Sequence, residues 1–200
     1  MIEKKRIPAN VQIEFPAAEL PYVIVKDIND CDTLPKFMES CQKVLSTGQN
    51  FLPIIIDSYG GSVYTAFGMM DFLDSLDVDI ITVCQSKAMS AGGLLFTMGK
   101  DRYASPLATF MIHEVWSIVF GKDTDIQNDA KETSRLNKKI FEILDKNTGQ
   151  KSGYWKALCK ENDNADLYLN TKQAKKHGMV TDLQIPHVET SVIIERKLVV

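Results

Sequence analysis

The sequence predicts an α/β fold organised as one domain. Short runs rich in β-branched residues alternate along the chain with stretches of helical periodicity, as in a parallel sheet joined by crossover helices. The 200 residues, 44% hydrophobic and 24% charged, have the size and composition of a single globular domain. We therefore expect residues 1–200 to form one domain without a linker or an internal repeat.

The first half of the chain contains two helices whose apolar residues recur three and four positions apart. These residues are Phe37, Cys41 and Val44 in a helix at 34–45, and Ala66, Met69, Leu73 and Leu76 in the next helix. Runs rich in β-branched residues predict strands before, between and after these helices, at 22–25, 52–56 and 80–84.

The second half begins with an expected loop at 86–89 and a short apolar helix at 91–98, whose composition requires burial on all sides. A strand follows at 109–112, and the longest helix is expected at 123–146. Its apolar stripe consists of Ile126, Ala130, Leu136, Ile140 and Leu144, with Thr133 completing it. Asn170 and Gln173 have the spacing of a capping box that opens a last helix, which Gly178 ends.

Charge and cysteine content argue against several function classes. The net charge of −3 gives no pull toward nucleic acid or an anionic membrane. The four cysteines form no CxxC pair and have no histidine at ligand spacing, which argues against zinc and a disulfide framework and favours a reducing compartment. The N-terminus is charged, and the longest largely apolar run, at 88–98, is far shorter than the roughly 20 residues of a membrane helix. We expect a cytoplasmic protein with no metal and no nucleic-acid or membrane partner.

Ser90 is the first candidate for chemistry. It stands where a strand passes into the short apolar helix, so the free N–H groups and the dipole of the helix N-terminus favour negative charge beside its hydroxyl. The small residues Ala91, Gly92 and Gly93 leave room for a peptide to approach. The alternative is that Ser90 only caps the helix, a role in which serine is preferred.

Two further segments carry groups that complement a serine. Gly60 and Gly61 permit close backbone approach, and their N–H groups can donate to an oxyanion, although such glycines also occur in ordinary turns. His113 follows directly on a predicted strand, at the edge where open α/β sheets bind ligands; a buried structural histidine is the alternative. His177 fits a favourable charge at a helix C-terminus, and His187 lies near the tail.

Six motifs occur in an order that matches one protein family. They are Ser58-Tyr59-Gly60-Gly61-Ser62, the segment from Cys84 to Gly92, Met111-Ile112-His113, Thr124-Asp125-Ile126, Asp166-Leu167-Tyr168-Leu169, and Ala174 with His177-Gly178-Met179-Val180. Over about residues 20–185 these motifs resemble ClpP, the proteolytic subunit of the Clp protease. The resemblance implies a ClpP/crotonase-like spiral of βαβ units with a projecting handle made of a strand and a long helix.

The resemblance implies a serine peptidase that forms an acyl-enzyme on unfolded polypeptides or short peptides. It makes Ser90 the nucleophile, His113 the general base and Asp166 the carboxylate that orients the imidazole. The backbone N–H groups of Gly61 and Ala91 become the oxyanion hole. No metal or organic cofactor is implied.

The chain departs from the family pattern near the expected substrate groove. Tyr59 replaces the proline of the glycine turn, which we expect to relax the turn without affecting catalysis. Glu114-Val115 replaces the family's Gln-Pro, which places a carboxylate and an extra backbone donor beside the groove. We expect substrate contacts from Gly60, Glu114, Val115 and Trp116.

Assembly is a further expectation. Residues 115–120 form a nearly continuous apolar run, and exposed apolar patches usually mark interfaces, although a core strand is the alternative. The resemblance implies a homo-oligomer, a heptameric ring or a double ring, with an ATP-dependent AAA+ unfoldase as partner. The arginine that the family uses between rings is absent, because Asn164-Ala165 precede Asp166, and residues 1–20 do not match the axial loop that meets the unfoldase.

Three other functions stay open from the residues. Lys87 lies three positions before Ser90, and this region also resembles serine–lysine enzymes of the signal-peptide-peptidase type. A crotonase-like acyl-CoA enzyme builds its oxyanion hole in the same way. An inactive ring scaffold is the non-catalytic alternative.

Overall fold

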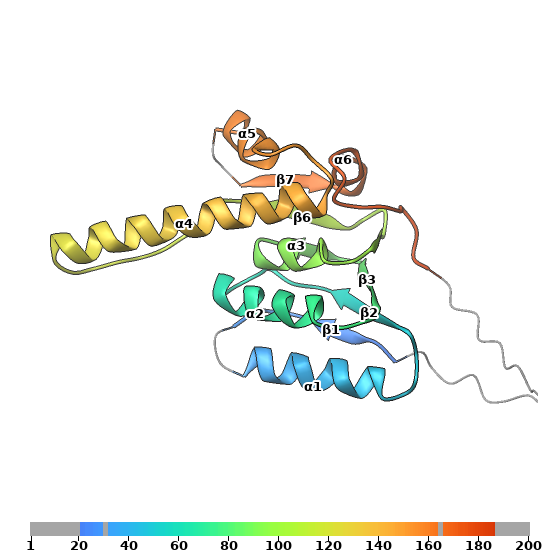
Figure 1. Ribbon diagram of the computed structural model, residues 1–200. Helices are drawn as coiled ribbons and strands as arrows, with labels where there is room; N and C mark the ends of the chain where they lie inside the picture. Colours follow the sequence, from blue (N-terminus) through green and yellow to red (C-terminus); the bar gives the residue numbers. More distant parts are fainter. Residues whose placement is uncertain (1–20, 30–31, 164–165, 187–200) are drawn as a thin grey trace, which may run out of the picture. The chain divides into compact units, whose positions relative to one another are not determined.

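Two β-sheets carry the fold (Figure 1). The computed structural model describes residues 21–29, 32–163 and 166–186. The larger sheet is parallel with the order β1-β2-β3-β5, and the smaller has the order β4-β6-β7, with β4 parallel and β7 antiparallel to β6. The strands are β1 (Val23–Val25), β2 (Phe51–Ile56), β3 (Asp79–Cys84), β4 (Lys87–Met89), β5 (Asp101–Ala104), β6 (Thr109–Ile112) and β7 (Leu167–Asn170).

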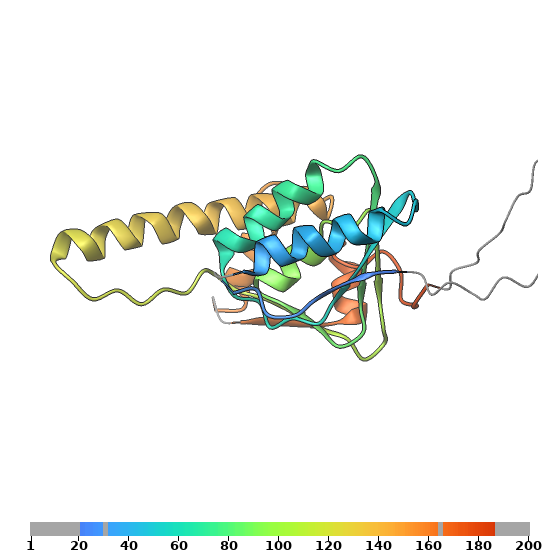
Figure 2. The same ribbon diagram turned by 90° about the horizontal axis from the view of Figure 1, so that it is seen from below.

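The helices confirm the predicted α/β class. They are α1 (Thr33–Leu45), α2 (Val63–Asp74), α3 (Ala91–Phe96), α4 (Asp123–Asn147), α5 (Tyr154–Glu161) and α6 (Thr171–Lys176). α1 joins β1 to β2 and α2 joins β2 to β3, so neighbouring parallel strands are connected by βαβ crossovers. From α1 to α4, each helix packs beside the next (Figures 1 and 2).

The apolar faces that periodicity predicts in α1 and α2 are buried in the core. The buried residues of these faces are Phe37, Cys41 and Val44 in α1, and Ala66, Met69 and Leu73 in α2. Because burying such side chains stabilises each helix against the sheet by roughly 1.5–3 kcal/mol per large residue, these two crossovers form a fixed support for the strands beneath them.

Only the second half of α4 is buried. Leu136, Ile140 and Leu144 face the core, whereas Ile126 is 48% exposed. The first half of the helix extends beyond the sheets (Figures 1 and 2). The helix predicted from the apolar stripe is confirmed, and only the second half of the stripe is buried.

Four short elements differ from the prediction. β4 lies where we expect a loop, and β5, α5 and β7 lie where the pattern predicts no element. Strands of three or four residues carry little periodicity of their own. They form because a distant partner is in register, β4 with β6 and β5 with β3.

Residues 113–121, here called the connecting segment, join β6 to α4 and run beside that helix (Figure 2). The strand expected in the handle is not formed: the connecting segment contains no strand and makes no backbone–backbone hydrogen bond with another described residue. A strand needs a paired neighbour, and the described part of the chain supplies none here. Trp116, Ile118 and Phe120 are 74%, 62% and 91% exposed.

Residues 21–186 form one compact unit. Residues 1–20 and His187 lie outside the described residues, as do Cys31 and Asn164-Ala165. That the whole chain forms one domain stays a prediction. Within the described residues, no helix has both the length and the apolar composition to span a membrane.

Candidate active site

The segments that follow β2, β4 and β6 line one cavity of about 580 Å³. They are neighbours because Ser58, just beyond β2, bridges to Ala88 in β4, and β4 pairs with β6. The cavity therefore collects Gly61, Ser90 and His113 from three separate parts of the sequence. Strand ends are the expected place for a ligand site in such a sheet.

The backbone of Ser90 is strained, and its side chain does not cap the helix that follows. Its φ is 52° and its ψ is −125°, a conformation that non-glycine residues rarely adopt and that tends to persist at functional sites. It stands at the N-cap of α3, but its side chain makes no capping hydrogen bond. Its N–H donates to the carbonyl of Met111 at 2.8 Å. The interpretation of Ser90 as a mere cap therefore lacks its defining contact.

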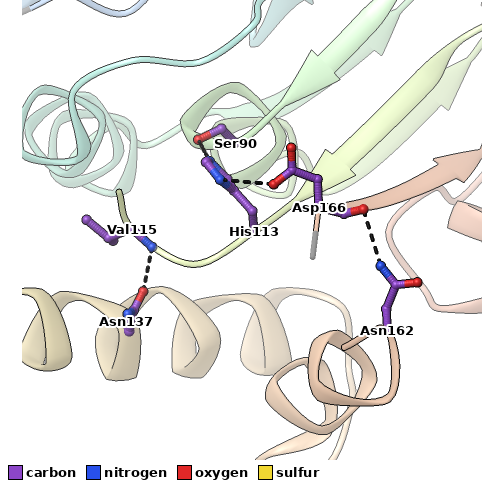
Figure 3. Close-up of polar contacts among 6 residues, drawn as sticks. All are labelled: Ser90, His113, Val115, Asn137, Asn162 and Asp166. Carbon is purple, nitrogen blue, oxygen red and sulfur yellow. Dashed lines mark hydrogen bonds and ion pairs between the residues drawn. The ribbon is translucent and has the colours of Figure 1, made fainter. Parts of the chain in front are cut away.

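Ser90, His113 and Asp166 lie in one row (Figure 3). The Ser90 Oγ is 2.7 Å from His113 Nε2, a good hydrogen-bond distance. On the far side of the ring, His113 Nδ1 is 3.5 Å from Asp166 Oδ1, which is an ion-pair distance. The side chain of His113 is 27% exposed and that of Asp166 is 50% exposed, so the carboxylate end of the row is the looser one.

The glycine turn is pressed against Ser90. A Cβ on Gly60 would lie 2.7 Å from the Ser90 Cβ, and a Cβ on Gly61 would overlap the carbonyl oxygen of Ile28. Their φ angles of +105° and +138° also favour glycine. No larger residue fits either position.

The two glycines differ in what they offer to a ligand. The Gly60 N–H donates to Ser58 Oγ at 3.0 Å, the Gly60 carbonyl accepts from Ile28 N–H at 2.8 Å, and Gly60 does not line the cavity. That Gly60 contacts substrate stays a prediction. Gly61 and Ala91 line the cavity beside Ser90, and their N–H groups donate to no acceptor among the described residues.

Lys87 is held away from proton transfer by an ion pair. Its ammonium donates to Asp57 Oδ1 at 2.6 Å and lies 4.4 Å from the centre of the Tyr59 ring. The hydrogen bond to Asp57 raises the pKa of Lys87, and the same bond lowers the pKa of Asp57. Lys87 thus remains a cation and makes no hydrogen bond to Ser90 within the described residues, which argues against the serine–lysine alternative.

The same contacts include Tyr59, which replaces the family's proline. Its ring lies against the Lys87 ammonium, and Asp57, at the start of the turn, holds that ammonium by charge. That the turn is relaxed stays a prediction.

Glu114, Val115 and Trp116 line the cavity, as expected of substrate-contacting residues. The extra backbone donor expected at Val115 is not free, because the Val115 N–H donates to Asn137 Oδ1 at 2.6 Å (Figure 3). That expectation is wrong. The carboxylate of Glu114 remains available at the edge of the cavity.

The cavity has a charged wall and an apolar wall. Three carboxylates and no lysine or arginine are among the described residues that line it, namely Glu114, Asp129 and Glu132. The apolar wall comes mainly from α2, α3 and α4, with Val63, Leu94, Leu136, Ile140 and Leu144. The site can therefore hold an apolar side chain next to a region of negative charge.

Glu132 is a fixed charge in this wall. It accepts hydrogen bonds from Arg135 and from the Tyr64 hydroxyl, at 2.6–2.8 Å. Arg135, followed by Tyr64, lowers the pKa of Glu132 to about 2. Because Tyr64 belongs to α2 and Glu132 to α4, the contact also joins the two helices across the cavity edge.

His177 differs from its predicted role. We expect a favourable positive charge at a helix C-terminus, but burial lowers the pKa of His177, and its Nδ1 is 2.6 Å from the Tyr154 hydroxyl. The ring is thus hydrogen-bonded to Tyr154, and burial disfavours the positive charge that we expect.

Cys41, Cys84 and Cys159 are free and buried, and burial raises their pKa values to about 12, 12 and 11. Within the described ranges, no group of three or more His, Cys, Asp or Glu residues is arranged to hold a metal ion.

Sequence reasoning missed Asn137, Asp57 and Tyr64. Each makes its contact with a residue 22 to 68 positions away along the chain. Opposite charge on Asp57 and Lys87 at two strand ends is the only signal that could have linked one of these pairs in advance. Asn137 lies on a helix face with nothing in its surroundings to mark it.

A comparison with protein-family models matches residues 44–185 to the Clp protease family. The match covers more than half of the chain and includes the glycine turn, Ser90, His113 and Asp166. It agrees with the order of motifs and with the parallel sheet and crossover helices described above. The chain therefore belongs to the Clp protease family.

Proposed function

We propose that this protein is a serine endopeptidase that cleaves peptide bonds in unfolded polypeptides or short peptides. The observation that carries the proposal is the 2.7 Å distance between Ser90 Oγ and His113 Nε2 at the edge of a peptide-sized cavity. Membership of the Clp protease family supports it.

In the first half of the reaction, Ser90 Oγ attacks the carbonyl carbon of the scissile bond while His113 Nε2 takes the hydroxyl proton. Asp166 orients the ring through Nδ1 and stabilises the imidazolium. The N–H groups of Gly61 and Ala91 donate to the oxygen that becomes negative. His113 then gives the proton to the leaving amine, the C–N bond breaks, and an ester on Ser90 remains.

In the second half, a water molecule attacks that ester and gives a proton to His113. When the second tetrahedral intermediate breaks down, His113 returns the proton to Ser90 Oγ and the acid product leaves. Ser90, His113 and Asp166 thus end the cycle in their starting protonation states.

The lining of the cavity supports a substrate preference. An apolar side chain of the peptide fits against the wall of α2, α3 and α4, and the carboxylate of Glu114 favours substrates with basic residues near the scissile bond. We place Glu114, Val115 and Trp116 along the bound peptide.

The exposed apolar residues of the connecting segment support assembly. We propose a homo-oligomer, in the form of a heptameric ring or a double ring, with Trp116, Ile118 and Phe120 in contacts between copies. An AAA+ unfoldase that delivers unfolded chains is part of this proposal.

The test of the proposed function is Ser90→Ala, assayed with a fluorogenic peptide and with an unfolded protein. We expect a loss of about 10⁴-fold or more with unchanged thermal unfolding, because alanine fits the same space. Ser134→Ala, the same change on the exposed face of α4, should leave turnover unchanged. A Ser90→Ala enzyme that keeps a tenth of its turnover would refute the proposal and favour the acyl-CoA or scaffold alternatives.

A further inference from the structure

Two hydrogen bonds join the connecting segment to α4, one from a backbone group near His113 and one from the Ser117 hydroxyl to Asp129 Oδ1 at 2.9 Å. Residues 113–121 make no backbone–backbone hydrogen bond with another described residue. Their one described main-chain hydrogen bond is from the Val115 N–H to the side-chain oxygen of Asn137, at 2.6 Å. Asn137 lies on α4 directly opposite Val115 (Figure 3).

The position of Asn137 on α4 makes it a firm anchor. It follows Leu136 and precedes Ile140 by less than one turn, and both of these residues are buried in the core. The contact is itself partly buried, where a hydrogen bond is worth more than at the surface. Because the buried half of α4 is fixed in the core, its hydrogen bond through Asn137 restrains the backbone at Val115, two residues beyond His113.

His113 needs such an anchor because its other restraints are weak. The β6–β7 ladder ends at Ile112, and the contact of His113 Nδ1 with the half-exposed Asp166 is 3.5 Å long. The ring must nevertheless stay within hydrogen-bond distance of Ser90 Oγ. A misplacement of about 1 Å in a reacting group can cost on the order of 100-fold in rate.

We propose that Asn137 is a positioning residue for the peptidase reaction, acting through the Val115 N–H to hold His113 in line with Ser90. This inference rests on the proposed function. It also explains how the chain functions with valine where the resembling family has proline: the N–H that valine introduces is satisfied by Asn137 rather than left free.

The test is a double-mutant cycle between Asn137 and Val115, measured as kcat and KM for a fluorogenic peptide and as the rate at which a fluorophosphonate labels Ser90. We expect Asn137→Leu to lower kcat and the labelling rate together by about tenfold or more, with KM changed much less. Asn137→Asp keeps an acceptor oxygen and should retain most of the activity. Asn128→Leu, the same change at an exposed asparagine of α4, is the matched control and should have no effect.

Val115→Pro removes the donor, so in that background Asn137→Leu should change kcat by less than about twofold. Equal losses from Asn137→Leu in the wild-type and Val115→Pro backgrounds, or an unchanged kcat in Asn137→Leu alone, would overturn the inference. If Asn137→Leu does not fold, Asn137→Ala takes its place in the same cycle. An active Ser90→Ala enzyme would instead refute the proposed function, which separates the two failures.

Discussion

Ser90 is held by main-chain hydrogen bonds, whereas the connecting segment, which begins at His113, is held by hydrogen bonds to side chains of α4. On the serine side, Ser90 N–H donates to Met111, and Ser58 exchanges backbone bonds with Lys87 and Met89 at 3.0 Å. On the histidine side, the one described main-chain hydrogen bond of the connecting segment runs from the Val115 N–H to the Asn137 side chain, and the Ser117 hydroxyl donates to Asp129 Oδ1 at 2.9 Å. The two sides meet at the 2.7 Å contact between Ser90 and His113.

The difference teaches which changes each side tolerates. Main-chain bonds depend on the backbone and survive most side-chain substitutions, so the groups proposed to stabilise negative charge are insensitive to sequence except at the two glycines. The histidine side depends on Asn137, Asp166 and Asn162, whose Nδ2 donates to the Asp166 carbonyl at 3.3 Å (Figure 3). We expect substitutions near the histidine to have graded effects.

The largest contrast is between His113→Ala and Lys87→Ala. His113→Ala should lower kcat by about 10⁴-fold, because no other base reaches Ser90 among the described residues. Lys87→Ala should have only a mild effect, because Asp57 raises the pKa of Lys87 and the ammonium does not accept protons. Steady-state kinetics on both variants check this, and an inactive Lys87→Ala beside an active His113→Ala would favour a serine–lysine enzyme.

The next contrast is between Asp166→Asn and Asp163→Asn. Asp166→Asn should lower kcat by about 10²- to 10³-fold, less than the roughly 10⁴ of a buried triad carboxylate, because Asp166 is half exposed and 3.5 Å from the ring. Asp163 has a φ of 56°, a conformation that asparagine adopts readily, so Asp163→Asn should cost little. Equal losses of kcat in the two variants would mean that the carboxylate is misassigned.

The connecting segment should also govern assembly. Changing Trp116 and Phe120 together to serine removes the largest exposed apolar groups of the segment, and we expect the oligomer to dissociate. Sedimentation velocity measures this, with Leu107→Ser, an exposed apolar residue elsewhere, as control. A wild-type protein that sediments as a folded 22.5 kDa monomer at micromolar concentration with full peptidase activity would contradict the chamber mechanism.

The smallest expected effect is a change in selectivity at Glu114. Glu114→Gln should reduce the preference for a peptide with arginine over one with glutamate beside the scissile bond by about 3- to 10-fold, and added salt should reduce it in the wild type. Ratios of kcat/KM for paired fluorogenic peptides measure it. Glu142→Gln removes the same charge on α4 outside the cavity lining and should leave the ratio unchanged; if both variants behave alike, Glu114 does not contact substrate.

Sequence reasoning could place the groups of the serine side because they belong to local motifs. The glycine turn and His113 each follow a strand that composition identifies, Ser90 precedes a helix that composition identifies, and parallel strand ends meet at one edge. The Gly60 contact, the free Val115 donor and the relaxed Tyr59 turn could not be judged in the same way. Each depends on a partner distant in sequence, namely Ile28, Asn137 and Lys87.

The strand of the handle failed as a prediction for a related reason, whereas the long helix of the handle is present. Apolar content in 115–120 predicts a strand, but strand formation depends on a neighbour, and none is paired with it in the described chain. Burial of α4 likewise stops where the sheets end, which periodicity along the helix does not reveal.

The most direct measurement identifies the residue that a fluorophosphonate labels covalently. It is read by mass spectrometry of the intact protein and of its peptides. We predict one adduct per chain on Ser90, lost in Ser90→Ala and slowed by at least a hundredfold in His113→Ala. Labelling at another residue, or labelling of Ser90 at the same rate without His113, would contradict the claim that His113 activates Ser90 as the nucleophile.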